Sequence, residues 1–196
     1  MVKWKNFSSL NLDGTHSILS PSKHSWLNYD EQKMTTYMQN MYAKEEGTEL
    51  HALAAELIKK GITLEAEGLS GKKTLNMYVN DAIGYHMRPE QLLVYSLNCY
   101  GTADAITYNE KKKFLRIHDL KTGTIPASMD QLRIYEALFC LCYDIKPGDI
   151  TSELRIYQND EIIIDRPASQ DILEIMEKIK WLDQIIDDFK TKQEGE

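Results

Sequence analysis

The stretch that follows Pro89, "QLLVYSLNCYGTADAITYNEKKKFLRIHDLKTG", constrains the fold of this chain more than any other. It is rich in β-branched and aromatic residues and contains one polar turn, at residues 109–112. These features predict three consecutive antiparallel strands. The apolar run at residues 114–117 leads to an aspartate and a lysine two residues apart. These are Asp119 and Lys121, at the end of the third strand.

The residues before this stretch have helical spacing. Ser20 before Pro21 is typical of a helix start, with serine as the cap and proline in the first turn. A long helix is predicted over residues 31–44, and a second is predicted to open at Gly47 and to end at Gly61. The segment "KTLNMYVNDAIGY" predicts a third helix.

The residues after it predict a helix, a strand pair and a closing helix. "SMDQLRIYEALFCLCYDI" predicts an apolar helix capped by Ser128 or Asp130, and "SELRIYQNDEIIIDR" predicts two strands around residues 159–160. The closing amphipathic helix has an apolar stripe that we expect to face the core rather than to form an oligomer seam. The stripe consists of Ile172, Ile175, Ile179, Leu182 and Ile186.

This order of elements predicts an α/β fold in which helices flank a central mixed β-sheet, with a helical N-terminal portion. A length of 196 residues favours one domain over residues 1–196. The longest apolar runs are interrupted by charges too early for a membrane span, and "MVKWKNFSSLNLDGTHS" lacks the apolar core of a secretory signal. The chain has three cysteines, an odd number, which argues against a disulfide framework. The expected location is therefore a reducing cytoplasm.

The net charge of −7 argues against indiscriminate coating of nucleic acid, which requires a basic surface. Short basic clusters at residues 59–60, 72–73 and 111–113 leave room for local phosphate binding. The alternative is that these lysines belong to solvated loops.

Two aspartates and a lysine are predicted to meet on one face of the hairpin over residues 101–121. If its turn is centred on residues 110 and 111, Asp104 faces Ile117, and facing residues share a side of the sheet. Side chains alternate along a strand, so Asp119 and Lys121 lie on the same side as Ile117. Asp104 and Asp119 then become diagonal neighbours, roughly 7–8 Å apart at the backbone.

Two carboxylates this close repel each other unless a cation lies between them, and oxygen ligands suit Mg²⁺. Lys121 beside them would stabilise charge on a phosphate or orient an attacking water. The alternative is an ordinary exposed hairpin with a weak cross-strand ion pair. Two observations count against that alternative: Gly101 permits a bend or close approach before Asp104, and Asp119 ends an apolar strand.

Four short motifs carry a resemblance to a known family. They are "GTELH" (residues 47–51), "GTADAI" (101–106), "HDLKTG" (118–123) and "QLRIY" (131–135), in this order along the chain. In sequence and spacing they resemble the motifs of the PD-(D/E)XK nuclease superfamily, in particular its RecB-like exonuclease branch with single-domain phage members. The earlier segment "LSPSKHSWL" resembles the first helix of that branch.

The resemblance implies a restriction-endonuclease-like core and a metal-dependent catalytic site. The implied ligands of Mg²⁺, for which Mn²⁺ can substitute, are His51, Asp104, Asp119 and the backbone carbonyl of Leu120. It also implies Lys121 as the catalytic lysine, and Gln131, Tyr135 and Thr122 as residues that support the site or contact DNA. Without the resemblance, His51 would read as a histidine packed among leucines, and Gln131 and Tyr135 as core and rim residues.

The function expected from these observations is a divalent-metal-dependent DNA nuclease, an exonuclease acting on linear or single-stranded DNA in recombination and repair. The alternatives are a non-cleaving nucleic-acid-binding or accessory protein on a nuclease-like fold, and a structure-specific endonuclease. The sequence contains no Walker loop, so a helicase or recombination partner would be a separate chain. With three cysteines that do not frame the motifs, no iron–sulfur cluster is expected. The expected setting is the cytoplasm of a bacterial or phage-infected cell.

Overall fold

The computed structural model describes residues 17–19, 21–65, 73–123 and 125–194. Contacts between residues divide the chain into two units, Met1–Lys44 and Glu45–Glu196. The expectation of one nuclease domain over residues 1–196 stays a prediction. In the first unit, the 3₁₀ helix η2 (Pro21–Asn28) precedes the start of helix α1 (Glu31–Lys60). Ser20, the predicted cap, lies outside the described residues.

Helix α1 begins with a side-chain cap and ends at a glycine. Asp30 Oδ1 accepts a hydrogen bond of 2.7 Å from the backbone N–H of Lys33, which satisfies one of the free donors of the first turn. Gly61 has a φ of 65°, the left-handed conformation that terminates helices. The predicted end of the helix at Gly61 is therefore confirmed.

The predicted break before Gly47 is wrong, because α1 runs through it without interruption. Gly47 is buried inside the helix. A Cβ atom on Gly47 would lie 2.7 Å from the Thr122 hydroxyl oxygen, closer than atoms can pack. The glycine thus serves close packing against the segment after the third strand, and it neither opens nor ends a helix.

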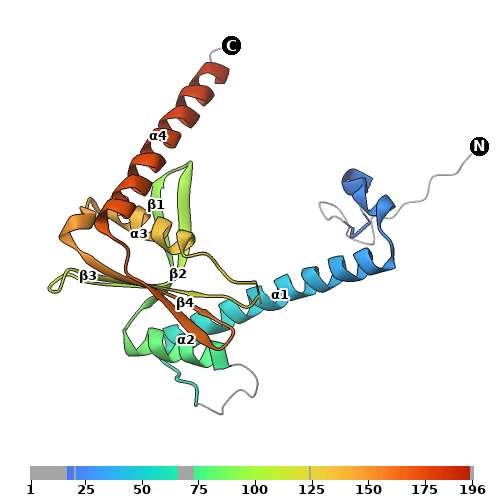
Figure 1. Cartoon of the computed structure of the whole chain (residues 1–196), viewed down its shortest axis with the longest axis horizontal. Helices are drawn as coiled ribbons and strands as arrows, with labels where there is room; N and C mark the ends of the chain where they lie inside the picture. The colour runs from blue at the N-terminus through green and yellow to red at the C-terminus, as the bar shows by residue number, and fades with distance from the viewer. Residues whose placement is uncertain (1–16, 20, 66–72, 124, 195–196) are drawn as a thin grey trace, which may run out of the picture. The chain divides into compact units, whose positions relative to one another are not determined.

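The second unit is built on a five-stranded mixed sheet with the order β1-β2-β3-β4-β5 (Figure 1). The strands are β1 (Arg88–Ser96), β2 (Cys99–Asn109), β3 (Phe114–Leu120), β4 (Thr151–Gln158) and β5 (Glu161–Asp165). Only β3 and β4 are parallel among these strands, and the other three neighbouring pairs are antiparallel. The three predicted antiparallel strands and the predicted strand pair are confirmed.

The register of the β2–β3 hairpin differs from the predicted one. Ile106, not Asp104, pairs with Ile117, because the turn is centred one residue later, over residues 110–113. The ladder ends at Ala105 and His118, and one step further along the two strands are Asp104 and Asp119. Moving the centre of a turn by one residue shifts each partner by two positions, which preserves the face of every side chain.

Helices cover both faces of the sheet. Helices α3 (Asp130–Tyr143) and α4 (Ser169–Glu194) lie on one side, and α2 (Lys73–Gly84) lies on the other side (Figure 1). The α3 side is packed around Leu93, Ile117 and Leu132, and the α2 side around Val79 and Leu120. The α/β class with helices on both sides of a mixed sheet is therefore established.

Two predicted details of the helices on the α3 side need correction. Neither Ser128 nor Asp130 is the N-cap of α3; that position is Met129, and the Ser128 hydroxyl instead accepts a bond of 3.1 Å from the Asp130 N–H. In α4, Ile172 is fully buried, but Leu182 and Ile186 are exposed. The stripe therefore faces the core only in its first half, because the second half of α4 runs beyond the sheet (Figure 1). No helix in the described part of the chain is long and apolar enough to cross a membrane.

Candidate metal centre

Helix α1 brings His51 to the strand residue Asp104. The Nδ1 atom of His51 lies 3.3 Å from Oδ2 of Asp104. Their hydrogen bond raises the pKa of His51 above its ordinary value, although partial burial of the ring opposes this. The same Asp104 oxygen accepts a hydrogen bond of 3.0 Å from the backbone N–H of Leu120. Asp104 is thus fixed from a helix and from the end of β3.

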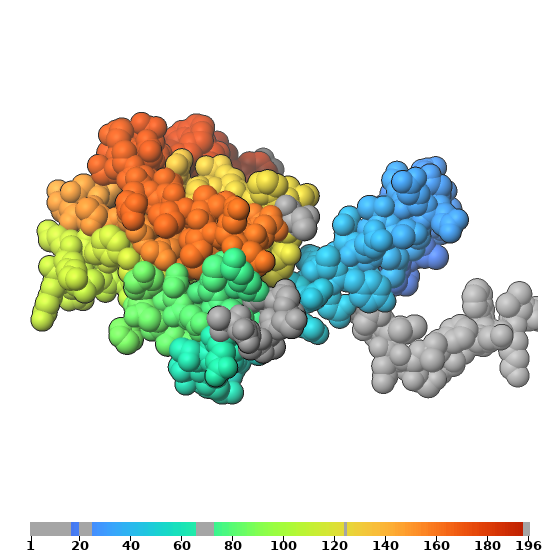
Figure 2. All heavy atoms as spheres, turned by 60° about the horizontal axis from the view of Figure 1, so that its bottom comes forward, coloured from blue at the N-terminus to red at the C-terminus, as the bar shows by residue number. Residues whose placement is uncertain are grey.

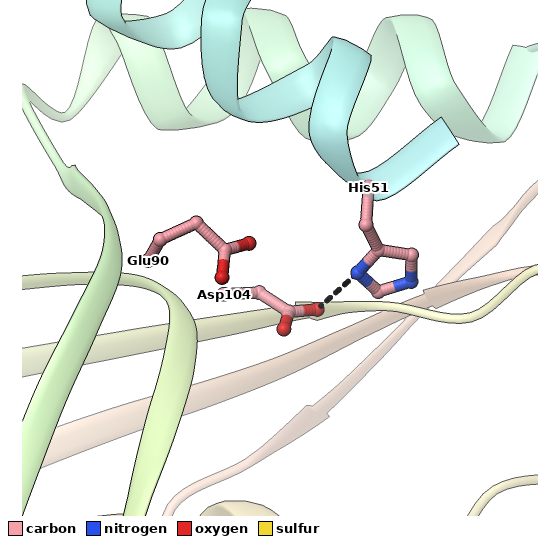
Figure 3. Close-up of side chains that lie close together, drawn as sticks. All are labelled: His51, Glu90 and Asp104. Carbon is pink, nitrogen blue, oxygen red and sulfur yellow. Dashed lines mark ion pairs between the residues drawn. The ribbon is translucent and has the colours of Figure 1, made fainter. Parts of the chain in front are cut away.

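Glu90 on β1 completes a group that can hold a metal ion. One nitrogen of His51 and one carboxylate oxygen each of Glu90 and Asp104 lie within 4.8 Å of one another. Figure 3 shows the side chains of His51 and Glu90 converging on Asp104 from α1 and β1. Burial and the neighbouring Asp104 carboxylate both raise the pKa of Glu90.

Glu90 is a residue that the sequence analysis missed. Its neighbours pair with Ala105 and Ala103 on β2, so Glu90 lies across from Asp104. Its φ of 52° is unusual for a strand residue without a glycine's freedom. The signal available in the sequence was the β1–β2 hairpin: with its register worked out, a glutamate would have appeared opposite the first aspartate.

Asp119 lies at the end of β3 and is only 2% exposed. Burial, together with the charge of Asp104, raises its pKa from 3.8 to about 6, against the opposing effect of Lys121. Its Oδ2 atom is buried, and the partner that the described residues give it is the Lys121 ammonium at 3.0 Å. A buried carboxylate oxygen without a hydrogen bond is costly unless a cation approaches it.

Lys121 links Asp119 to helix α3. Its ammonium donates to Asp119 Oδ1 at 3.1 Å and to the side-chain carbonyl of Gln131 at 2.8 Å. Two fixed acceptors on different elements hold the flexible lysine side chain in one position. The positive charge therefore lies directly beside the acidic group.

Tyr135, one turn after Gln131, packs against the start of β2. A Cβ atom on Gly101 would lie 2.9 Å from the Tyr135 ring, so the glycine permits the close approach that the sequence suggested. Burial raises the pKa of Tyr135, and its hydrogen bond with Gln131 opposes that effect. Thr122 lies against Gly47 of α1. Gln131 thus contacts Lys121 directly, whereas Tyr135 supports Gln131.

His118, the neighbour of Asp119 in the chain, belongs to a different environment. It is fully buried, packs edge-on against Tyr85 in the turn after α2, and its Nδ1 atom lies 3.2 Å from the Tyr157 hydroxyl. Burial, with the nearby charges of Arg155 and Arg116, lowers its pKa to about 2, so the ring is neutral. It is a packed core histidine.

The structure brings together most of the residues that the sequence analysis singled out. His51 contacts Asp104, Leu120 reaches Asp104 through its N–H, and Lys121 contacts Asp119. Asp119 is not a member of the closest ligand group, in which Glu90 takes part instead. The ligand role of the Leu120 carbonyl stays a prediction.

The chemistry of this donor set fits a hard divalent cation. The group of His51, Glu90 and Asp104 offers two carboxylates and one imidazole, which are oxygen and nitrogen donors of the kind that Mg²⁺ and Mn²⁺ accept. Burial first, and then the charge of Asp104, raise the pKa values of Glu90 and Asp119, so their ionised forms are disfavoured without a nearby cation. The arrangement therefore favours a bound cation next to a fixed ammonium group.

Comparison of the chain with protein-family models and with curated proteins gave no match.

Proposed function

We propose that this chain is a divalent-metal-dependent DNA nuclease with a restriction-endonuclease-like core. The observation that carries the proposal is the juxtaposition of a carboxylate–imidazole group with a fixed lysine. His51, Glu90 and Asp104 lie within mutual ligand distance, and Asp104 and Asp119 stand at the end of the ladder where Lys121 is held. The resemblance of the four motifs to those of the PD-(D/E)XK superfamily supports the same reading.

His51, Glu90, Asp104 and Asp119 are the residues that would hold Mg²⁺ or Mn²⁺. Such an ion, when bound, neutralises phosphate charge and makes a water molecule more acidic. The Asp119 carboxylate is suited to this role because its oxygens offer about four acceptor sites, and among the described residues the donor to its side chain is Lys121. Protonation of Asp119, whose pKa is raised to about 6, would weaken the site in acid.

Lys121 would stabilise the negative charge that develops on the phosphate in the transition state. Preorganised donors are effective because they need no reorientation as the reaction proceeds. Gln131 and Asp119 hold the ammonium, so each acts as a positioning residue as well. The His51 imidazole, bonded to Asp104, fixes that carboxylate toward the cation site. The substrate we propose is linear or single-stranded DNA, cleaved as by an exonuclease.

The test is a cleavage assay on end-labelled linear duplex, linear single strand and closed circular DNA, with Mg²⁺, Mn²⁺ or chelator. We expect metal-dependent loss of the linear substrates. Lys121→Ala should lower the rate at least 100-fold, the usual cost of removing a preorganised donor. A matched control is Lys111→Ala in the exposed β2–β3 turn, which should keep full activity.

Two outcomes would contradict this proposal. Equal activity of Lys121→Ala and the parent protein would show that Lys121 has no role in catalysis. If the protein cleaves no substrate and calorimetry detects no Mn²⁺ binding, the assignment of the metal site is refuted. Cleavage of the closed circle, in turn, would favour an endonuclease over the exonuclease, because a closed circle has no free end.

A second candidate is an accessory protein on a nuclease-like fold that binds nucleic acid or a protein partner without cutting. The net charge of −7 favours the form that binds a protein partner, because an acidic protein gains little from phosphate contacts. Metal binding without cleavage of any substrate, in the parent protein and in Lys121→Ala alike, is the result expected for it.

A further inference from the structure

A pocket of about 210 Å³ opens directly beside the candidate metal centre. Three of its lining residues connect it to that centre. Lys121 contacts Asp119, the N–H of Leu120 donates to Asp104, and Leu50 immediately precedes His51 on α1. A group held in this pocket would therefore lie near a phosphate held at the centre, so that both could belong to one nucleotide.

The pocket has apolar walls from three elements. Leu50 comes from α1, Leu75 from the start of α2, and Leu120 from the end of β3. Leu75 and Leu120 are almost fully buried, so these walls are fixed by the core of the second unit. Pockets for drug-sized ligands span roughly 300–1,000 Å³, so this smaller volume suits a single ring system.

Polar groups line the rest of the pocket at fixed positions. Asp160, in the turn between β4 and β5, accepts hydrogen bonds of 2.9 Å from the N–H and the hydroxyl of Thr74. The Thr74 hydroxyl also lies 2.7 Å from the Asp160 N–H, so the start of α2 and this turn are joined rigidly. Figure 2 shows orange atoms of the β4–β5 region directly against green atoms of α2. Thr122 and Asn159 add a hydroxyl and an amide to the lining.

The charges of the pocket disfavour a second phosphate. Glu46 and Asp160 line it, and among the described lining residues the one ammonium, that of Lys121, is already engaged by Asp119. A neutral heterocycle with N–H groups at its edge suits carboxylate, hydroxyl and amide partners, while its faces suit leucine side chains. Nucleobases combine these properties.

We propose that this pocket binds the nucleobase of a nucleotide adjacent to the scissile phosphate. This inference rests on the proposed function for its place in catalysis, but base binding itself requires neither metal nor phosphate. The nucleotide is then held at two points, through its base in the pocket and through its phosphate at the metal centre. Two-point binding fixes the phosphate relative to Lys121.

The first test measures binding of deoxynucleosides, which carry no phosphate, by saturation-transfer NMR in the presence of chelator. Leu50→Trp places a larger side chain in the pocket. Leu53→Trp is the matched control, because Leu53 is an exposed residue of the same helix and does not line the pocket. We expect signals in the parent protein and in Leu53→Trp, and at least a fivefold smaller signal in Leu50→Trp. Equal signals in the three proteins would overturn the proposal.

The second test removes the base from the substrate instead. In single-stranded oligonucleotides, an abasic nucleotide on one of the two sides of the scissile phosphate should lower kcat/KM at least fivefold for the parent protein. The same abasic nucleotide should have no further effect on Leu50→Trp, because its pocket is already filled. Independent, multiplicative effects would count against the pocket. A thermal melt of each variant shows whether the fold is intact.

The two proposals fail in distinguishable ways. Nucleoside binding that Leu50→Trp abolishes, without cleavage of any DNA, would retain the base pocket and refute the nuclease. If metal-dependent cleavage proceeds at the same rate with the abasic nucleotide and in Leu50→Trp, the nuclease is retained and the base pocket is refuted.

Discussion

At the scale of single residues, Asp119 shows a conflict between stability and function. It is buried, it lies near another carboxylate, and its pKa is raised to about 6. The folded protein therefore holds a proton on Asp119 in the range where the unfolded chain has lost it. Stability that is present below about pH 4 is lost as the pH rises to 6. A group retained at such a cost is expected at a functional site.

The first prediction concerns Asp119→Asn in the metal-free protein. Because asparagine mimics the neutral acid, the free energy of unfolding at pH 8 should rise by about 1–3 kcal/mol, the scale of a shift of two pKa units. The gain should vanish below pH 4, and cleavage should be lost. Urea unfolding at both pH values measures this. The control Asp149→Asn, at an exposed site, should change neither quantity. Lower stability of Asp119→Asn at pH 8 would contradict the prediction.

The sequence predicted the site residues that one hairpin brings together, but not those that depend on contacts between distant segments. Side chains alternate along strands, so a hairpin places Asp104 and Asp119 near each other even when its register is predicted two positions off. Glu90 depends on a second hairpin and on a left-handed backbone conformation, which no local pattern indicates. The contact of His51 with Asp104 joins residues 53 positions apart, and only the resemblance suggested it.

At the scale of elements, glycines determine how closely the helices approach the sheet. Gly47 reads as a helix boundary from the sequence, because glycine is a poor helix former. In the structure it continues α1 and allows contact with Thr122. Packing between distant segments outweighs local propensity here, which explains why the predicted break was wrong. Gly101 has the same role between β2 and α3.

The second prediction tests that role of Gly101. Gly101→Ala should destabilise the protein by about 1–3 kcal/mol, the usual cost of overpacking, because the new methyl group would meet the Tyr135 ring at 2.9 Å. Tyr135→Leu should relieve the clash, so the double variant should be more stable than the sum of the two single effects predicts. Chemical denaturation measures all three variants. Gly84→Ala, where no atom lies within 4 Å of the added group, serves as the control; an equal loss there would reject the explanation.

The third prediction concerns the contact between α3 and β4. Glu136 of α3 is buried and accepts a hydrogen bond of 2.8 Å from the Ser152 hydroxyl. Burial raises its pKa from 4.5 to about 7, with the Ser152 bond opposing. Because the folded pKa is the higher one, stability should fall as the pH rises from 4.5 to 7, by an amount on the order of 3 kcal/mol.

Glu136→Gln should remove that part of the pH dependence and keep an acceptor for Ser152. Thermal unfolding between pH 4.5 and 8 in the presence of chelator provides the measurement. Glu177→Gln, at an exposed position of α4, should leave the parent profile unchanged. If Glu136→Gln follows the parent profile, the pH dependence arises elsewhere.

At the scale of the whole molecule, the proposed function requires an acidic chain to act on an acidic polymer. The net charge is −7, and Glu90, Asp104 and Asp119 gather negative charge around the ammonium of Lys121, with the charge of Lys59 acting on Glu90 as well. A phosphate would be repelled from this group until a cation neutralises it. Under the proposed function, metal binding is thus a condition for substrate binding as well as for cleavage.

The fourth prediction follows from this charge balance. Lys121→Ala, which should bind DNA without cutting it, is expected to bind a labelled single strand at least tenfold more tightly with Mg²⁺ than with chelator at equal ionic strength. Fluorescence anisotropy measures the two dissociation constants. Adding Glu90→Gln should reduce the difference, because one ligand is lost. Equal affinity with and without Mg²⁺ would show that DNA binds elsewhere on the surface.

The turn between β2 and β3 has a practical consequence. Residues 110–113 are exposed, and Phe114 and Asp119 are five positions, or roughly 16 Å, apart along β3. A cysteine at Lys111 or Lys112 would therefore offer an attachment point for a dye or a surface tether at a distance from the metal centre. Since the turn closes a rigid ladder, the dye would report rotation of the whole second unit, which suits single-molecule observation of the chain on a stretched strand.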